Sequence, residues 1–164
     1  MADLTLWSLS DSRPLQVLPR GEVRTTEQSK VELAKLKPGL EGHAEIVVGE
    51  EHTAPRIGSG RVRVLATPVM INLMEAAALD ACENLIPPGH QSLGTRLDVR
   101  HIAATPVGMR VRATARLVSV QGRTLEFQVE AHDERDLIGD GTHQRLVVNV
   151  ARFDQRVQAK LAKN

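Results

Sequence analysis

Apolar and polar residues alternate with a period of two in several stretches of this 164-residue chain. Successive side chains of a strand point to opposite faces of a sheet, so this pattern predicts strands that each bury one face. Five strands are expected, the first beginning near Gly42 and the others spanning about 93–102, 109–119, 125–132 and 137–150. Gly139 and Gly141 in the last strand indicate a bulge or a close approach of a neighbouring backbone.

One long stretch between the first two strands has a different pattern. Residues 68–85 are almost entirely apolar, which is typical of a helix that is buried on most of its circumference. Thr67 followed by Pro68 fits an N-cap threonine with proline in the first helical position. Glu75 lies at the edge of the polar sector of this helix, so it can face either solvent or a cleft. Upstream, residues 51–63 contain one proline and two glycines, and we interpret them as a mobile loop in a position to act as a lid.

The order of these elements, namely strand, loop, helix and four further strands, predicts the fold class. An apolar helix is buried only by a sheet that covers most of it. We therefore expect a single α+β domain in which a curved antiparallel five-stranded sheet wraps around one long central helix, the hotdog arrangement. This domain is expected over residues 38–155, between a partly flexible N-terminal extension (residues 1–37) and a helical C-terminal tail (residues 156–164). A homodimer is expected, because five strands leave sheet edges and one side of the helix uncovered.

Composition narrows the classes of function. Basic and acidic residues nearly balance, for a net charge of +1, and aromatic residues are scarce, so nucleic acid is not an expected partner. We expect no membrane association and a cytoplasmic protein, because no run of about 18 apolar residues and no signal-like start is present. The single cysteine, Cys82, fits a reducing compartment. The histidines show no pair at metal-ligand spacing, so neither a metal nor a cofactor is assigned.

A histidine on an apolar strand face is the first candidate for chemistry. Strict alternation over residues 93–102 groups five residues on the face toward the core: Leu93, Thr95, Leu97, Val99 and His101. A ring in that place is either a core histidine with a satisfied hydrogen bond or an acid/base catalyst. Glu75 on the helix is the expected partner, because a carboxylate without one would be costly in a buried helix. The pair of Glu75 and His101 is therefore the expected centre of a site.

Several short segments of the chain resemble, in order and in spacing, those of a known family. They are Ala66-Thr67-Pro68, Leu73-Met74-Glu75, Gly94-Thr95-Arg96-Leu97-Asp98-Val99-Arg100-His101, Ala103-Ala104-Thr105-Pro106-Val107-Gly108 and Gly141-Thr142-His143-Gln144-Arg145. Over about residues 40–155 the chain resembles the fluoroacetyl-CoA thioesterase family of hotdog proteins. The resemblance implies a dimeric hotdog enzyme that hydrolyses an acyl-CoA thioester.

The same resemblance implies roles for five positions. Thr67, Glu75 and His101 would form the catalytic group, in which Glu75 attacks the carbonyl or activates water and His101 transfers the proton. The backbone N–H of Gly94 would hold the thioester carbonyl, and Arg145 would support the site. Taken without the family, Thr67 has a sufficient role as a helix cap, and Arg145 is equally an exposed strand residue.

Two departures from the family pattern bear on specificity and support of the site. Members specific for fluoroacetyl-CoA have phenylalanines in the loop before the helix, whereas residues 58–64 contain no aromatic residue, and Gln144 stands where a glutamate commonly precedes the arginine. We therefore expect a thioesterase for a small acyl-CoA that is not specific for fluoroacetyl-CoA. Two alternatives stay open: a non-catalytic acyl-CoA-binding or sensor protein and, less favoured, a hotdog 3-hydroxyacyl hydratase or dehydratase.

Overall fold

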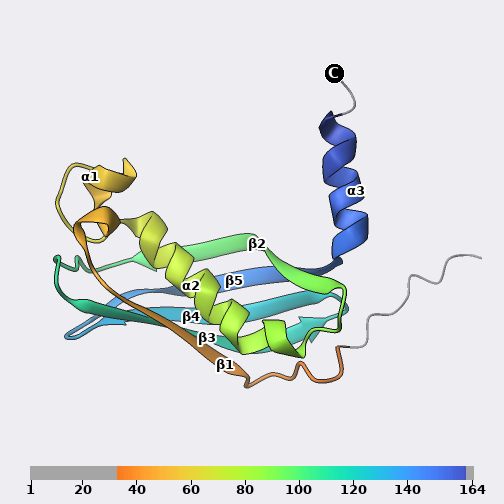
Figure 1. Ribbon diagram of the computed structural model, residues 1–164. Helices are drawn as coiled ribbons and strands as arrows, with labels where there is room; N and C mark the ends of the chain where they lie inside the picture. The colour runs from red at the N-terminus through yellow and green to blue at the C-terminus, as the bar shows by residue number, and fades with distance from the viewer. Residues whose placement is uncertain (1–32, 162–164) are drawn as a thin grey trace, which may run out of the picture. The chain divides into compact units, whose positions relative to one another are not determined.

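The computed structural model describes residues 33–161, whose strands form one antiparallel sheet (Figure 1). The strands are β1 (Glu41–Val47), β2 (His90–His101), β3 (Arg110–Gln121), β4 (Thr124–Asp133) and β5 (Leu137–Asn149). Their order in the sheet is β1-β3-β4-β5-β2, so β1 and β2 are its edges. The helices are the short α1 (Ala54–Ile57), the long α2 (Thr67–Cys82) and α3 (Val150–Leu161), and 3-10 turns span Glu50–His52 and Glu83–Leu85.

Helix α2 lies across one face of the sheet, and the two bury a common apolar core (Figure 1). The buried residues of α2 are Met70, Leu73, Met74, Ala77, Ala78, Ala81 and Cys82. Gly42 of β1 permits the close approach of helix and sheet, because a Cβ there would lie 2.3 Å from backbone atoms of Ala77 and Ala81. The predicted α+β hotdog arrangement, a curved five-stranded sheet around one long helix, is confirmed.

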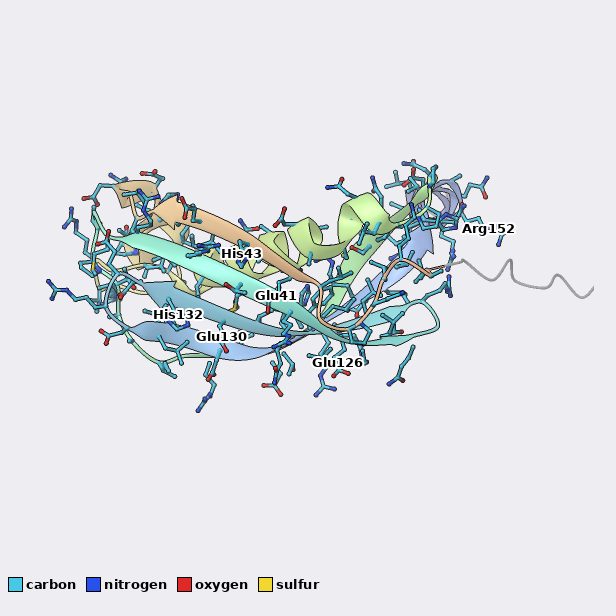
Figure 2. All side chains as sticks on the ribbon, turned by 90° about the horizontal axis from the view of Figure 1, so that it is seen from below. Glu41, His43, Glu126, Glu130, His132 and Arg152 are labelled. Atoms are coloured by element: carbon cyan, nitrogen blue, oxygen red, sulfur yellow. The ribbon has the colours of Figure 1, made fainter. Side chains whose placement is uncertain are left out.

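The opposite face of the sheet is polar. Glu41, His43, Glu130 and His132 are exposed on this face (Figure 2). Apolar residues toward α2 therefore alternate with polar residues toward solvent, which is the pattern that predicted the strands.

Strand β2 departs from strict alternation at Thr95. Gly94 pairs with Arg145 of β5, and Arg96 pairs with the adjacent Gln144, so Thr95 has no partner of its own. One extra residue in a strand is a β-bulge, and it moves the following side chains to the other face.

The bulge corrects part of the predicted core-facing set. Three residues beyond the bulge face α2 as predicted: Leu97, Val99 and His101. Before the bulge Gly94 takes that face instead of Leu93, and the exposed Thr95 does not belong to it. Gly94 and His101 therefore share the face toward the helix, although strict alternation separates them.

The segment before α2, interpreted from sequence as a loop, contains short helical structure. A 3-10 turn and α1 occupy much of residues 50–57, and a bridge between Thr53 and Leu65 joins the two ends of the segment. Helix α1 lies beside the N-terminal end of α2 (Figure 1). The segment therefore covers the end of the helix at which Thr67 is found.

The two ends of the described region differ in their relation to the core. Leu33 and Leu36 are buried in the core, although they fall in the expected extension; residues 1–32 lie outside the described region. At the other end α3 begins at Val150 and continues to Leu161, and its residues beyond Val150 are all exposed. In the part of the chain that the structure describes, no helix combines the length and the apolar character needed to cross a membrane.

Candidate active site

A groove of about 310 Å³ opens beside the N-terminal end of α2. Its lining comes from α1 and the loop after it, from the start of α2, and from the end of β2 with the following turn: Ala54, Ser59, Val64, Leu65, Thr67, His101, Ile102, Ala103 and Ala104. No phenylalanine, tyrosine or tryptophan is among these lining residues. The groove thus offers a wall of small and branched apolar side chains with three polar groups, Ser59, Thr67 and His101.

Thr67 and His101 are joined by a hydrogen bond in this groove. The Thr67 hydroxyl lies 2.8 Å from Nδ1 of His101. The predicted N-cap role of Thr67 is wrong, because the cap residue is Ala66 and Thr67 is the first residue of the helix. Its hydroxyl is consequently available to orient the imidazole ring, which is a tertiary contact that local helix signals do not report.

The second ring nitrogen of His101 is buried and has no hydrogen-bond partner among the described residues. Burial lowers the pKa of His101 below its ordinary value, and the backbone of Ala103 opposes this shift in part. The imidazole is therefore neutral at neutral pH.

Glu75 lies in a different cluster, farther along α2. Its Oε1 is 3.8 Å from Nη1 of Arg145 and 3.7 Å from Nε2 of His143. Gly94 provides the space for this carboxylate, because a Cβ on Gly94 would lie 2.2 Å from Oε1 of Glu75. The carboxylate thus rests against the bare backbone of β2, with a guanidinium beside it.

Arg145 is almost fully buried, with 4% of its surface exposed. It donates through Nε to the Ser92 hydroxyl at 2.9 Å and through Nη2 to the Ser92 carbonyl at 3.0 Å. The Ser92 hydroxyl in turn donates to Oε2 of Glu83 at 2.7 Å. Arg145 is therefore a buried charge with fixed hydrogen bonds, and the alternative of an exposed strand arginine is wrong.

The structure brings the five predicted site residues into two groups. Thr67 and His101 form one group, and Glu75, Gly94 and Arg145 form the other. Thr67 and Glu75 are separated by about 12 Å along the helix axis, given a rise of about 1.5 Å per residue. Within one chain, the described residues show no hydrogen bond between Glu75 and either Thr67 or His101.

Three residues of the second group were missed from sequence: Ser92, Glu83 and His143. His143 and Arg145 share one face of β5, and that face is otherwise apolar, so the signal that singled out His101 was present here too. Ser92 gave no such signal. Across the described region, no three histidine, cysteine or acidic side chains form a group that could hold a metal ion.

Comparison with known proteins places the chain in a family. The family model for fluoroacetyl-CoA-specific thioesterase matches residues 48–151. The fluoroacetyl-CoA thioesterase of Streptantibioticus cattleyicolor is 47% identical over 97 residues, which are 59% of this chain and 70% of that protein.

Solved structures agree in fold. The fluoroacetyl-CoA thioesterase FlK is 38% identical, with a TM-score of 0.72 over 76% of this chain and 97% of that one. A thioesterase superfamily member from Thermus thermophilus is 30% identical, with a TM-score of 0.72 over 78% of this chain and 97% of that one. The chain therefore belongs to the fluoroacetyl-CoA-specific thioesterase family, and it is a thioester hydrolase with the hotdog fold.

Proposed function

We propose that this protein hydrolyses a small acyl-CoA thioester to the free acid and CoA. The observation that carries the proposal is the Thr67–His101 hydrogen bond in the groove, which leaves Nε2 of His101 buried and without a partner among the described residues. Because the chain belongs to a thioesterase family, we assign thioester hydrolysis to this arrangement.

Each proposed site residue has a role that follows from its surroundings. The Glu75 carboxylate either attacks the thioester carbonyl itself or deprotonates a water molecule that attacks it. The oxyanion is stabilised by the N–H of Gly94 and by the start of α2, where the Thr67 N–H has no acceptor among the described residues. The neutral His101 takes up the proton that the water loses, directly or from Glu75, and passes it to the departing CoA thiolate. The hydroxyl of the water ends on the acyl carbon and its proton on sulfur, so one water is added across the C–S bond.

A homodimer is part of the proposal, because a single chain keeps the required groups too far apart. The helix separates Thr67 from Glu75 by about 12 Å, which is too far for both to act on one carbonyl group. A site that contains all three groups must then take Thr67 and His101 from one subunit and Glu75 from the other.

Strand β2 supports this assembly, because it is an edge of the sheet and carries both Gly94 and His101. In a two-fold dimer, edge strands pair antiparallel with their own copies. A β2–β2 pairing centred between Leu97 and Asp98 would set Gly94 of one subunit near His101 of the partner subunit. Glu75 lies over Gly94, so this pairing would bring His101 to the carboxylate.

We further propose a substrate range that is not confined to fluoroacetyl-CoA. The groove lining lacks a phenylalanine, tyrosine or tryptophan, so no aromatic lid selects the acyl group there. A cytoplasmic location is proposed on the ground that Cys82 is a free, buried thiol, which suits a reducing compartment.

A panel of acyl-CoA thioesters, with a thiol reagent to detect released CoA, tests the function. The proposal expects turnover of short-chain substrates, with kcat/KM for acetyl-CoA and fluoroacetyl-CoA within about tenfold of each other. Saturable binding without CoA release would instead support a binding or sensor protein. A change in enoyl absorbance without CoA release would support a hydratase.

A further inference from the structure

His143 is fully buried, and its two ring contacts fix its protonation state. Nδ1 lies 3.0 Å from the carbonyl oxygen of Arg96, which can only accept, so Nδ1 carries the hydrogen. Nε2 lies 3.1 Å from Nη1 of Arg145, which can only donate, so Nε2 accepts. His143 is therefore the neutral Nδ1–H tautomer, and its 3.7 Å contact with Glu75 is not an ion pair.

The surroundings of His143 agree with a neutral ring. Burial lowers the pKa of His143, and the Arg145 charge adds to that effect, while the Arg96 carbonyl and Glu75 oppose it. The ring cannot serve as a proton donor at Nε2 without losing its bond from Arg145. It acts instead as a fixed acceptor for one N–H of the guanidinium.

Ser92 fixes the other side of the guanidinium. Its hydroxyl accepts from Nε of Arg145, and its carbonyl accepts from Nη2. Glu83 anchors Ser92 in turn, because Oε2 of Glu83 accepts from the hydroxyl. Each of the three nitrogens of Arg145 therefore has one N–H bound to Ser92 or His143, which fixes the plane and the position of the guanidinium.

This arrangement leaves Glu75 near a charge that does not hydrogen-bond to it. The distance from Nη1 of Arg145 to Oε1 of Glu75 is 3.8 Å, which is beyond hydrogen-bond range. A carboxylate that must attack a carbonyl or deprotonate water needs its lone pairs free. A direct bidentate bond from arginine would occupy those lone pairs.

We propose that His143 and Ser92 are positioning residues for Arg145, holding its guanidinium so that its charge, but none of its hydrogen bonds, reaches Glu75. The proposal rests on the role of Glu75 in the proposed function. His143 acts by accepting a hydrogen bond, so a side chain that keeps an acceptor at the same place replaces it, and an apolar side chain of similar size does not.

Paired substitutions at His143 test this role in the full-length protein. His143→Gln keeps an acceptor for Arg145, whereas His143→Leu removes the acceptor that fixes Nη1, so that Nη1 can move toward Glu75 and bind it. We expect His143→Gln to keep kcat within about threefold of wild type, and His143→Leu to lower kcat about 30-fold while KM stays within about threefold. Equal kcat values in the two variants, or a loss confined to KM, would overturn the proposal.

A second readout does not depend on activity. In ¹⁵N-labelled wild-type protein at pH 7, the NMR signals of the His143 ring should report a neutral imidazole protonated at Nδ1, with the signal assigned by its loss in His143→Gln. A hydrogen on Nε2 would overturn the proposal, whatever the variants do. If wild type releases no CoA, the proposed function fails, while this spectrum still decides whether His143 is a fixed acceptor.

If His143→Leu fails to fold, Ser92→Ala is measured in its place. We expect the same loss of kcat at constant KM, and an unchanged kcat would contradict the proposal.

Discussion

Two polar regions beside α2 differ in how far their hydrogen-bonding groups are already satisfied. At the N-terminal end of the helix, Thr67 and His101 share one hydrogen bond, and Nε2 of His101 has no partner among the described residues. Around Arg145, each guanidinium nitrogen already has an acceptor on Ser92 or His143. The first region is open to a groove, and the second is buried under the helix.

In the proposed function, this difference separates the groups that contact the substrate from the groups that hold the site in place. A group that lacks a partner can form a new bond with a bound molecule, whereas a satisfied network resists change and holds its members in one geometry. Glu75 stands at the border of the two kinds of region, since Arg145 and Gly94 place it while its carboxylate remains partly exposed. The predictions below perturb one region at a time.

Among the variants that keep both Glu75 and His101, the largest effect is expected for Gly94→Ala. The new methyl group would lie 2.2 Å from Oε1 of Glu75 and 3.1 Å from the His143 ring, so the carboxylate must move. A shift of about 1 Å in a catalytic group reduces rates by about 100-fold, and we expect a loss of kcat of that order. Gly60→Ala is the matched control, because its methyl group would meet only Ala54 at 3.4 Å. Equal activity in the two variants would remove Gly94 from the site.

A smaller loss is expected when the open region loses its one hydrogen bond. Thr67→Val keeps the shape of the side chain but deletes the hydroxyl that orients His101, and kcat should fall about tenfold. Thr67→Ser restores the hydroxyl and should recover most of that loss. A valine variant as active as the serine variant would show that the bond to His101 has no part in turnover.

The two regions share one pH effect on stability. Burial lowers the pKa of both His101 and His143 below the ordinary histidine value of 6.5. At a pH between the pKa in the folded protein and the ordinary pKa of the unfolded chain, the unfolded chain binds more protons. The free energy of unfolding is therefore highest above pH 6.5 and decreases as the pH is lowered. Urea denaturation from pH 8 to pH 5 measures this slope. The His143→Gln variant should show a shallower slope, and an identical slope would contradict the burial argument for His143.

The smallest effect is expected outside both regions. We propose that residues 156–164 are a tail beyond the domain, and the described part of that stretch, up to Leu161, is exposed throughout. A chain that stops after Gln155 should keep wild-type kcat and lose less than about 0.5 kcal/mol of unfolding free energy. A larger loss of stability would show that the end of α3 packs against something in the assembled protein.

The fold could be predicted from sequence because its signals are periodic. The alternation of apolar and polar residues predicted the five strands, and the mostly apolar residues 68–85 predicted a buried helix. The face of Gly94 could not be predicted in this way, because the bulge at Thr95 inserts one residue without changing the composition of the strand.

The sequence predicted the five residues of the candidate site but not their division into two separate clusters. A threonine before a proline is typical of a helix cap, so Thr67 was predicted there. Only the tertiary structure shows that the Thr67 hydroxyl is hydrogen-bonded to His101. Ser92 and Glu83 meet Arg145 through contacts between distant segments, which no local pattern carries. His143 did carry a signal, as a polar residue beside Arg145 on an apolar face.

The central claim is that one site takes Glu75 from one subunit and His101 from the other, and mixing two inactive variants tests it directly. Glu75→Gln and His101→Ala homodimers should each be inactive, because every site in them lacks one group. After subunit exchange at equal amounts, half of the dimers are hybrids, and each hybrid has one intact site. The account predicts recovery of about a quarter of wild-type CoA release. No recovery, with hybrid dimers shown to be present, would contradict it.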